Sequence, residues 1–185
     1  MEYRNFGPAG LKVSPLAFGL GFRGQGDEKD AERAIVHALE RGVNLIDCAN
    51  VYGLRDDHHP DAIRSETILG RALKGRRDDA VITSKVTSAI GPGPNDRGNS
   101  RYHIMREVER SLKRLDTDRI DVYILHSWDP TTPIEETLRA LDDIQRQGKV
   151  RYVGCSNFAA WQIAIALGIQ ERIGASRFIL SLIHI

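Results

Sequence analysis

Short apolar runs alternate along this chain with segments of helical periodicity. The runs are typical of β-strands, and they lie near residues 16–19, 44–47, 80–84, 121–125, 150–154 and 177–182. Between them, apolar residues recur every three or four positions, as in helices that pack on one side. Strands joined by single helical crossovers run parallel. The pattern therefore predicts an α/β fold of about five to six βα units.

The ends of several predicted helices carry recognisable signals. Asp27 can cap the first helix, and Gly42 follows its last turn. Ser100 can cap a later helix, after a long loop over residues 89–99 that could cover a site. Residues 132–135, Thr-Pro-Ile-Glu, read as a capping box with proline at the first helical position. A last helix is expected over 159–167.

A small hairpin is expected ahead of the first parallel strand. Residues 3–15 contain two short extended segments around a turn at Gly7–Gly10.

Two kinds of parallel sheet fit these units, an open doubly wound sheet and a closed (β/α)₈ barrel. The glycines of Gly19-x-Gly21-x-x-Gly24 match a dinucleotide-binding fingerprint, and Asp47 could then hold a ribose. In that fingerprint the third glycine lies inside the helix, whereas Asp27 places the helix start beyond the motif. The barrel is therefore the favoured interpretation.

Composition narrows the class of protein. The 185 residues suffice for one domain, taken as residues 1–185, and 26 basic against 25 acidic residues give a net charge of +1. Neither nucleic acid nor an acidic membrane surface is an implied partner. No apolar run approaches the roughly 20 residues of a membrane span. Cys48 and Cys155 each follow an apolar run and are expected to be free, buried thiols, which indicates a reducing, cytoplasmic location.

Polar residues stand where the apolar runs stop. Asp47, Lys85 and His126 each end a run, and Ser156-Asn157 ends another. Tyr52 follows Asp47 by five residues. The carboxyl ends of parallel strands meet at one rim, where ligands bind. We therefore expect these side chains around the mouth of one cavity.

Together, four of these residues form a coherent set for delivering a proton. A tyrosine hydroxyl titrates near pH 10 in model peptides, and a neighbouring ammonium favours its phenolate. Lys85 can supply the ammonium, Asp47 can hold it, and His126 can orient a carbonyl oxygen. Tyr52 would then protonate that oxygen as hydride reaches the carbon, and hydride requires a nicotinamide cofactor.

These residues lie in motifs that give the chain a clear resemblance to the aldo-keto reductases. The resemblance runs from about residue 3 to about residue 178, and its motifs occur in the family's order and spacing. The matching segments are Gly10–Ser14, Ile46–Gly53, Glu66–Gly70, Thr83–Lys85, Ser111–Leu115, Asp121–His126, Gly148–Gly154 and Ser156–Asn157.

The resemblance implies a (β/α)₈ barrel with an N-terminal hairpin plug and NADPH as the cofactor. It implies Tyr52 as the general acid, tuned by Lys85 and Asp47, with His126 orienting a small-molecule carbonyl substrate. The expected cofactor-binding residues are Gly21, Phe22, Asp47, Ser156 and Asn157, of which the last two would bind the nicotinamide carboxamide. A non-catalytic, cofactor-sensing regulatory subunit on the same barrel is the alternative, and the oligomeric state stays open.

The chain also departs from the family's pattern. A (β/α)₈ barrel usually has about 250 residues. Residues 179–185 stand where the family has a glutamine beside the nicotinamide, so this tail is doubtful. The segments that hold the cofactor's phosphates would lie further on. The sequence therefore reads as an incomplete barrel, and residues 1–185 alone are expected to bind NADPH weakly and to be inactive.

Two further features have ordinary interpretations. Asp56, Asp57, His58, His59 and Asp61 resemble metal ligands, but they lack helical ligand spacing and read as a solvated loop, so no metal site is expected. Trp128 either walls the substrate pocket or covers the barrel rim.

Overall fold

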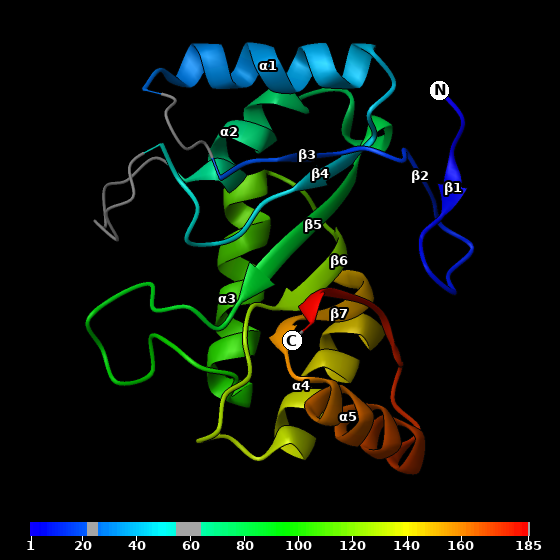
Figure 1. Ribbon diagram of the computed structural model, residues 1–185. Helices are drawn as coiled ribbons and strands as arrows, with labels where there is room; N and C mark the ends of the chain where they lie inside the picture. Colours follow the sequence, from blue (N-terminus) through cyan, green and yellow to red (C-terminus); the bar gives the residue numbers. More distant parts are fainter. Residues whose placement is uncertain (22–25, 55–63, 185) are drawn as a thin grey trace.

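The computed structural model describes residues 1–21, 26–54 and 64–184 (Figure 1). Its strands are β1 (Arg4–Asn5), β2 (Lys12–Val13), β3 (Ala17–Gly19), β4 (Leu45–Asp47), β5 (Val81–Val86), β6 (Ile120–Leu125), β7 (Val150–Phe158) and β8 (Phe178–His184). Its helices are α1 (Glu28–Glu40), α2 (Ser65–Ala72), α3 (Arg101–Leu115), α4 (Ile134–Arg146) and α5 (Ala160–Ile173), with a short 3₁₀ turn at Arg77–Asp79.

The main sheet is a curled, parallel half-barrel. Its six strands follow one another in the order β3-β4-β5-β6-β7-β8, and every neighbouring pair is parallel. A doubly wound sheet would reverse its strand order at a switch point. The consecutive order therefore excludes the open-sheet alternative and confirms a partial (β/α)₈ barrel. Successive helices contact one another around the outside of the curve (Figure 1).

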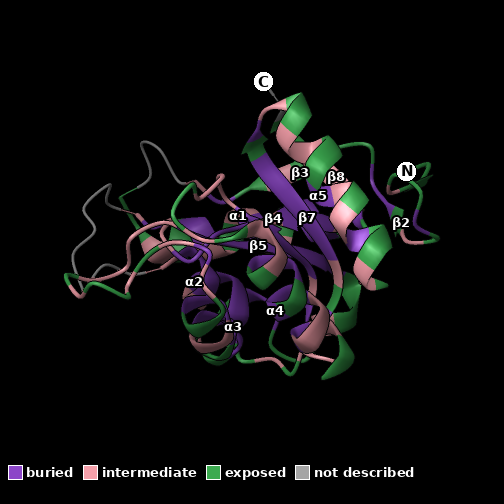
Figure 2. Ribbon diagram, turned by 90° about the horizontal axis from the view of Figure 1, so that it is seen from below, coloured by how far each residue is buried: buried purple, intermediate pink, exposed green. Residues whose placement is uncertain are grey.

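The sheet has two apolar faces with different neighbours. The main core lies between the strands and the helices, and it includes Ile46, Ile82 and Ile104 (Figure 2). A smaller cluster of Val13, Leu45 and Val81, to which Phe6 and Leu11 add partly buried side chains, joins the hairpin to the starts of β4 and β5. The antiparallel β1–β2 hairpin therefore packs against the amino-terminal ends of these strands, as a plug would.

Helix capping followed the sequence at two sites and departed from it at a third. Asp27 accepts a hydrogen bond from the Asp30 backbone, and Ser100 accepts one from His103. The capping box predicted at 132–135 is wrong, because α4 has Pro133 at its N-cap and no side-chain cap. The Thr132 hydroxyl instead donates to Asp129 at 2.7 Å. That carboxylate competes successfully for the hydroxyl that a capping box would use.

The last strands and helix are longer than their periodicity predicts. Strand β7 continues to Phe158 because β8 pairs with it along its length, up to Phe158 opposite His184. Helix α5 continues to Ile173 and ends at Gly174, which has a φ of 66°. In the described sheet, β3 and β8 are the two edges.

Glycine permits one close contact between helices. A Cβ on Gly70 of α2 would lie 2.7 Å from the backbone oxygen of Leu115, at the end of α3. This approach brings α2 and α3 side by side behind β4 and β5.

Candidate active site

Three consecutive strands carry the predicted polar side chains to the same edge of the sheet. Asp47 is the last residue of β4, Lys85 lies next to last in β5, and His126 directly follows β6. In the register of the sheet, Asp47 of β4 lies opposite Thr83 of β5, and Lys85 lies opposite Ile124 of β6. Because the strands are parallel and adjacent, the three side chains meet at the carboxyl rim.

Lys85 and Asp47 form a close ion pair. The Lys85 Nζ lies 2.7 Å from both carboxylate oxygens of Asp47 and 2.9 Å from the carbonyl oxygen of Cys48. The lysine side chain is fully buried, whereas that of Asp47 is 24% exposed. The ammonium is therefore held by three acceptors and has one orientation.

Tyr52 lies over this pair. Its ring centroid is 4.7 Å from the Lys85 Nζ, and its hydroxyl is 3.4 Å from the Nε2 of His126. The two rings meet edge to face, with centroids 5.6 Å apart. The structure thus brings together all four residues of the predicted proton-delivery set.

His126 is held as a neutral ring. Burial lowers the pKa of His126, the nearby Lys85 ammonium lowers it further, and the value falls to about 4 although Asp47 opposes the shift. Its backbone N–H donates to the Val86 carbonyl oxygen, and its Nδ1 lies 3.4 Å from the Ser88 hydroxyl. At neutral pH the imidazole can therefore donate one hydrogen bond and accept another.

The predicted carboxamide pair adjoins this group. Ser156 is buried near the end of β7, and Asn157 is exposed with a φ of 54°. The Asn157 amide donates to the carbonyl oxygen of His126 at 2.8 Å and to the Ser156 hydroxyl oxygen at 3.1 Å. Both residues lie within β7, whereas the sequence placed them after the strand. Gly21 follows β3 at the same rim, and Phe22 lies outside the described residues.

Sequence reasoning gave no role to two side chains that contact the set. The Thr83 hydroxyl donates to Asp47 at 2.5 Å, and the Thr87 hydroxyl accepts from the His126 backbone at 3.1 Å. Thr83 stands two residues before Lys85, so strand alternation places both side chains on the inner face. That spacing was the available signal. Ser84, between them, faces the helices and donates to Glu66 of α2.

The loop after β5 is tied to the loop after β6. Thr87 has a φ of 110°, and its hydroxyl donates to the side-chain oxygen of Asn99. The Asn99 backbone in turn donates to Asp129. Asp129 is partly desolvated, but hydrogen bonds from Thr131, Asn99 and Thr132 outweigh that effect and lower its pKa to about 2. These contacts fix the base of the loop next to His126.

Trp128 packs into this rim. Its ring meets Phe158 edge to face at 5.3 Å and Trp161 at 5.9 Å, and it also lines a hollow of about 530 Å³ beside the loop after β5. Trp128 thus covers the rim, whereas the hollow that it lines includes none of the four converging side chains, so its role in a substrate pocket stays a prediction. Cys48 and Cys155 are free and buried, as expected.

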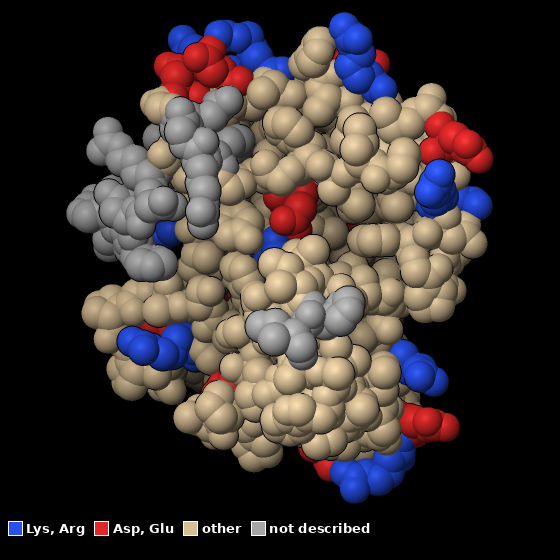
Figure 3. Space-filling view, viewed as in Figure 1, with Lys and Arg blue, Asp and Glu red and all other residues tan. Residues whose placement is uncertain are grey.

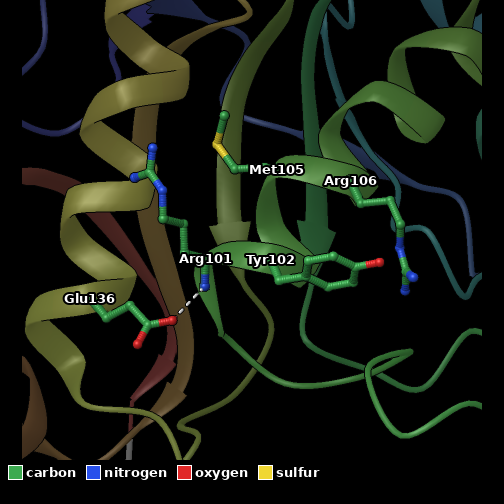
Figure 4. Close-up of a pocket in the computed structure, with 5 residues that line it drawn as sticks. All are labelled: Arg101, Tyr102, Met105, Arg106 and Glu136. Atoms are coloured by element: carbon green, nitrogen blue, oxygen red, sulfur yellow. Dashed lines mark hydrogen bonds between the residues drawn. The ribbon is translucent and has the colours of Figure 1, made fainter.

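Other hollows lie away from the rim. One of about 710 Å³ is lined by Arg101, Tyr102, Met105, Arg106 and Glu136, where α3 and α4 begin (Figure 4). No group of three or more potential metal ligands occurs in the part of the chain that the structure describes, and the acidic and histidine-rich stretch 56–61 lies outside it. None of the described helices is long and apolar enough to cross a membrane.

Charged side chains gather mainly toward the outline of the face seen in Figure 3. Apart from a small acidic and basic group near its centre, the middle of that face is largely uncharged.

Comparisons with known proteins agree with this architecture. The model of the aldo/keto reductase family matches residues 15–176. A probable voltage-gated potassium channel subunit beta of Arabidopsis thaliana is 42% identical over 178 residues, which are 94% of this chain and 52% of the relative. Its counterpart in Oryza sativa subsp. japonica is 39% identical over the same shares. An uncharacterized oxidoreductase of Bacillus subtilis, YrpG, is 42% identical over 180 residues, which are 93% of this chain and 54% of the relative.

This chain spans about half the length of these relatives. The family match covers most of the chain, including each strand that carries a rim residue. With the consecutive parallel strands, the hairpin plug and the four converging side chains, it leads to one conclusion: the chain belongs to the aldo/keto reductase family of oxidoreductases.

Proposed function

We propose that the protein reduces an aldehyde or ketone to an alcohol, with NADPH as the hydride donor. The observation that carries the proposal is the contact of the Tyr52 hydroxyl with His126, beside the buried Lys85 ammonium that pairs with Asp47. A hydroxyl so placed can deliver a proton to a carbonyl oxygen at the rim.

Tyr52 is the general acid in this proposal. When it gives up its proton, a negative charge develops on its oxygen, and the Lys85 ammonium stabilises that charge. Asp47 and the Cys48 carbonyl oxygen hold the ammonium under the ring. The donor pair therefore needs no reorganisation during the step, which is the basis of electrostatic preorganisation.

His126 orients the substrate. A neutral imidazole can donate a hydrogen bond from Nε2 to the carbonyl oxygen without protonating it outright. The His126 pKa of about 4 keeps the ring in this form at neutral pH. The substrate oxygen would thus contact both Tyr52 and His126.

Residues at the rim fit the nicotinamide end of the cofactor. A carboxamide offers one acceptor and two donors. Within the described hydrogen bonds, the Ser156 hydroxyl proton and the Asn157 side-chain oxygen have no protein partner, so they can supply the matching groups. No described residue approaches within 4 Å of the place where a Gly21 side chain would begin, and the Asp47 side chain is partly exposed. When bound, NADPH supplies the hydride, and the chain's own residues supply the proton.

The reducing environment that this chemistry needs fits the free thiols. Cys48 and Cys155 are both unpaired and buried. We therefore extend the proposal to a cytoplasmic location and to residues 1–185 as the N-terminal portion of one oxidoreductase domain.

A second candidate function is a non-catalytic, cofactor-sensing regulatory subunit. It is favoured by two relatives named as probable potassium channel beta subunits, at 42% and 39% identity. The complete set of four side chains favours the enzyme.

Turnover distinguishes the two. The protein from the complete open reading frame would be assayed against small aldehydes and ketones, using NADPH deuterated at the transferable position. Deuterium in the alcohol product supports reduction. Saturable NADPH binding without turnover of any carbonyl would refute the enzyme and support the subunit.

A further inference from the structure

Two fully buried carboxylates lie behind the rim, on the helix side of the sheet. Glu66 belongs to α2 and Glu107 to α3, and both are 0% exposed. Glu66 Oε2 accepts from the Nε of Arg114 at 2.6 Å, and Glu107 Oε1 accepts from Arg110 at 3.0 Å. Burying a carboxylate is costly unless it is paired, and these arginines provide the pairing.

The other oxygen of each carboxylate holds a residue next to the site. Glu66 Oε1 accepts from the Ser84 hydroxyl, and Ser84 precedes Lys85. Glu107 Oε2 accepts from the side-chain amide of Asn50 at 3.1 Å, and Asn50 precedes Tyr52 by two residues. Helices α2 and α3 therefore contact the segments that carry Lys85 and Tyr52 from the helix side of the sheet.

Asn50 is the more informative of these contacts. It is 1% exposed, and its backbone N–H faces the carbonyl oxygen of Lys85 at 3.4 Å. In the same turn, the Tyr52 backbone N–H donates to the Ala49 carbonyl oxygen. The Ser65 backbone N–H donates to the Tyr52 carbonyl oxygen, where the chain leaves the turn. Asn50 thus joins the Tyr52 turn, strand β5 and helix α3.

Packing alone does not explain an asparagine at this position. Its side-chain oxygen is buried and has no hydrogen-bond partner among the described residues. An unpartnered buried acceptor is unfavourable for stability, and such groups are rare in native proteins. The side-chain amide of Asn50 also donates a hydrogen bond to the Glu107 carboxylate. Hydrogen bonds to charged acceptors are stronger than those to neutral ones, so this bond offsets the cost of the unpartnered oxygen.

We propose that Asn50 and Glu107 are positioning residues for Tyr52: their hydrogen bond fixes the turn that directs the phenol hydroxyl toward His126. The inference rests on the proposed function and adds residues that touch neither substrate nor cofactor. A general acid displaced by about 1 Å can lose on the order of 100-fold in rate. Loss of this hydrogen bond should therefore lower kcat and leave NADPH binding unchanged.

The variant Asn50→Asp tests the hydrogen bond through its pH dependence. It keeps the shape of the side chain but sets a second carboxylate against Glu107. Two carboxylates at hydrogen-bond distance do not both ionise readily, so they share a proton as the pH falls. At neutral pH repulsion should displace the turn, and at lower pH the shared proton should restore the hydrogen bond.

Other charged and titratable groups face this pair and set where the proton is taken up. From α3 these are Arg110, Arg114 and His103, from α2 Glu66, and from β6 Tyr123. Burial lowers the pKa of His103, so it adds no positive charge at neutral pH. The two arginines favour ionised carboxylates and shift the recovery to lower pH.

Asn44→Asp is the matched control. Asn44 precedes β4 at the opposite end, where its side chain contacts Ser14 and Lys12, so the same chemical change occurs far from the rim. We expect kcat of Asn50→Asp to fall at least about tenfold at neutral pH, with the Kd for NADPH within about threefold. Relative to the parent, kcat should recover as the pH is lowered. Asn44→Asp should show neither effect.

A second readout does not depend on turnover. In protein with ¹³C-labelled tyrosine rings, the Tyr52 signals are assigned with Tyr52→Phe and their nuclear Overhauser contact with His126 is followed. We expect this contact to be lost in Asn50→Asp at neutral pH and in Asn50→Ala, and kept in Asn44→Asp. Asn50→Ala decides the matter if Asn50→Asp does not fold.

The inference is overturned if the Tyr52 signals stay unchanged in the folded Asn50 variants. It is also overturned if their loss of kcat does not exceed that of Asn44→Asp, or if acidification brings no recovery. A parent without turnover would refute the proposed function alone, and the Tyr52 signals would then still decide the positioning role.

Discussion

Replacing Tyr52 with phenylalanine removes one oxygen atom and leaves the rest of the site in place. The ring keeps its edge-to-face contact with His126 and its position over Lys85. The only hydrogen bond described for the hydroxyl is the 3.4 Å contact with His126, which is long and worth at most about 1 kcal/mol of stability. The folded state should therefore change little.

The catalytic effect should be far larger. General acid catalysis contributes about 10²–10⁴-fold, which corresponds to about 3–5 kcal/mol of barrier. We expect carbonyl reduction by Tyr52→Phe to fall by that factor, with an NADPH Kd close to the parent's. The assay is steady-state reduction of an aldehyde, combined with a fluorescence titration of NADPH. The control is Tyr102→Phe, which changes a 62% exposed tyrosine on α3 and should have no effect. Reduction within about tenfold of the parent would refute the role of Tyr52 as the acid.

Three further predictions concern Lys85, His126 and Asp129. Lys85→Met removes three hydrogen bonds and leaves the Asp47 carboxylate held by Thr83. The free energy of unfolding, measured by urea titration, should therefore fall by about 1–3 kcal/mol. An unchanged value would contradict the ion pair. In the folded protein the pKa of His126 is about 4, below the usual 6.5, so the unfolded chain binds a proton at this residue more readily. The free energy of unfolding should therefore fall as the pH drops from 6.5 to 4. The slope should be shallower in His126→Gln, and equal slopes would contradict the prediction. Asp129→Asn weakens the hydrogen bond that Asp129 accepts from the Asn99 backbone, so amide hydrogen exchange should increase around residues 97–100. Unchanged exchange would show that this hydrogen bond is not needed to hold the loop.

The sequence was sufficient for most of the fold because its signals there are local. Apolar runs and helical periodicity placed the parallel strands, and Asp27 and Ser100 marked true helix starts. The rim residues also followed from local sequence, since each stands near the end of a strand. Where the prediction failed, a contact from elsewhere intervened. Asp129 took the hydroxyl of Thr132, and pairing with β8 lengthened β7.

The support behind the rim could not be predicted for the same reason. Glu107 sits in a helix with charged residues at many positions, including Arg106, Glu109 and Arg110. Its spacing from Ile104 and Ser111 places it on the buried stripe of α3, unlike the exposed Glu109, but this spacing does not identify its hydrogen-bond partner. Its burial depends on the close approach of α2 and on the loop that brings Asn50 to it. The hydrogen bond between Asn50 and Glu107 joins segments 57 residues apart, and no local sequence pattern predicts that these two residues meet.

Strand β5 directs the side chains of Thr83, Ser84 and Lys85 alternately to the two faces of the sheet. This alternation affects how the strand finds its pairing register during folding. A slip of one residue would turn Thr83 and Lys85 away from Asp47 and toward the helix side of the sheet, where Arg114 already pairs with Glu66. The Asp47 carboxylate would then lose its described side-chain partners, and a second cation would crowd the Glu66–Arg114 pair, so the slipped register is disfavoured. The charges that the site needs thus also help to select the pairing register of β5.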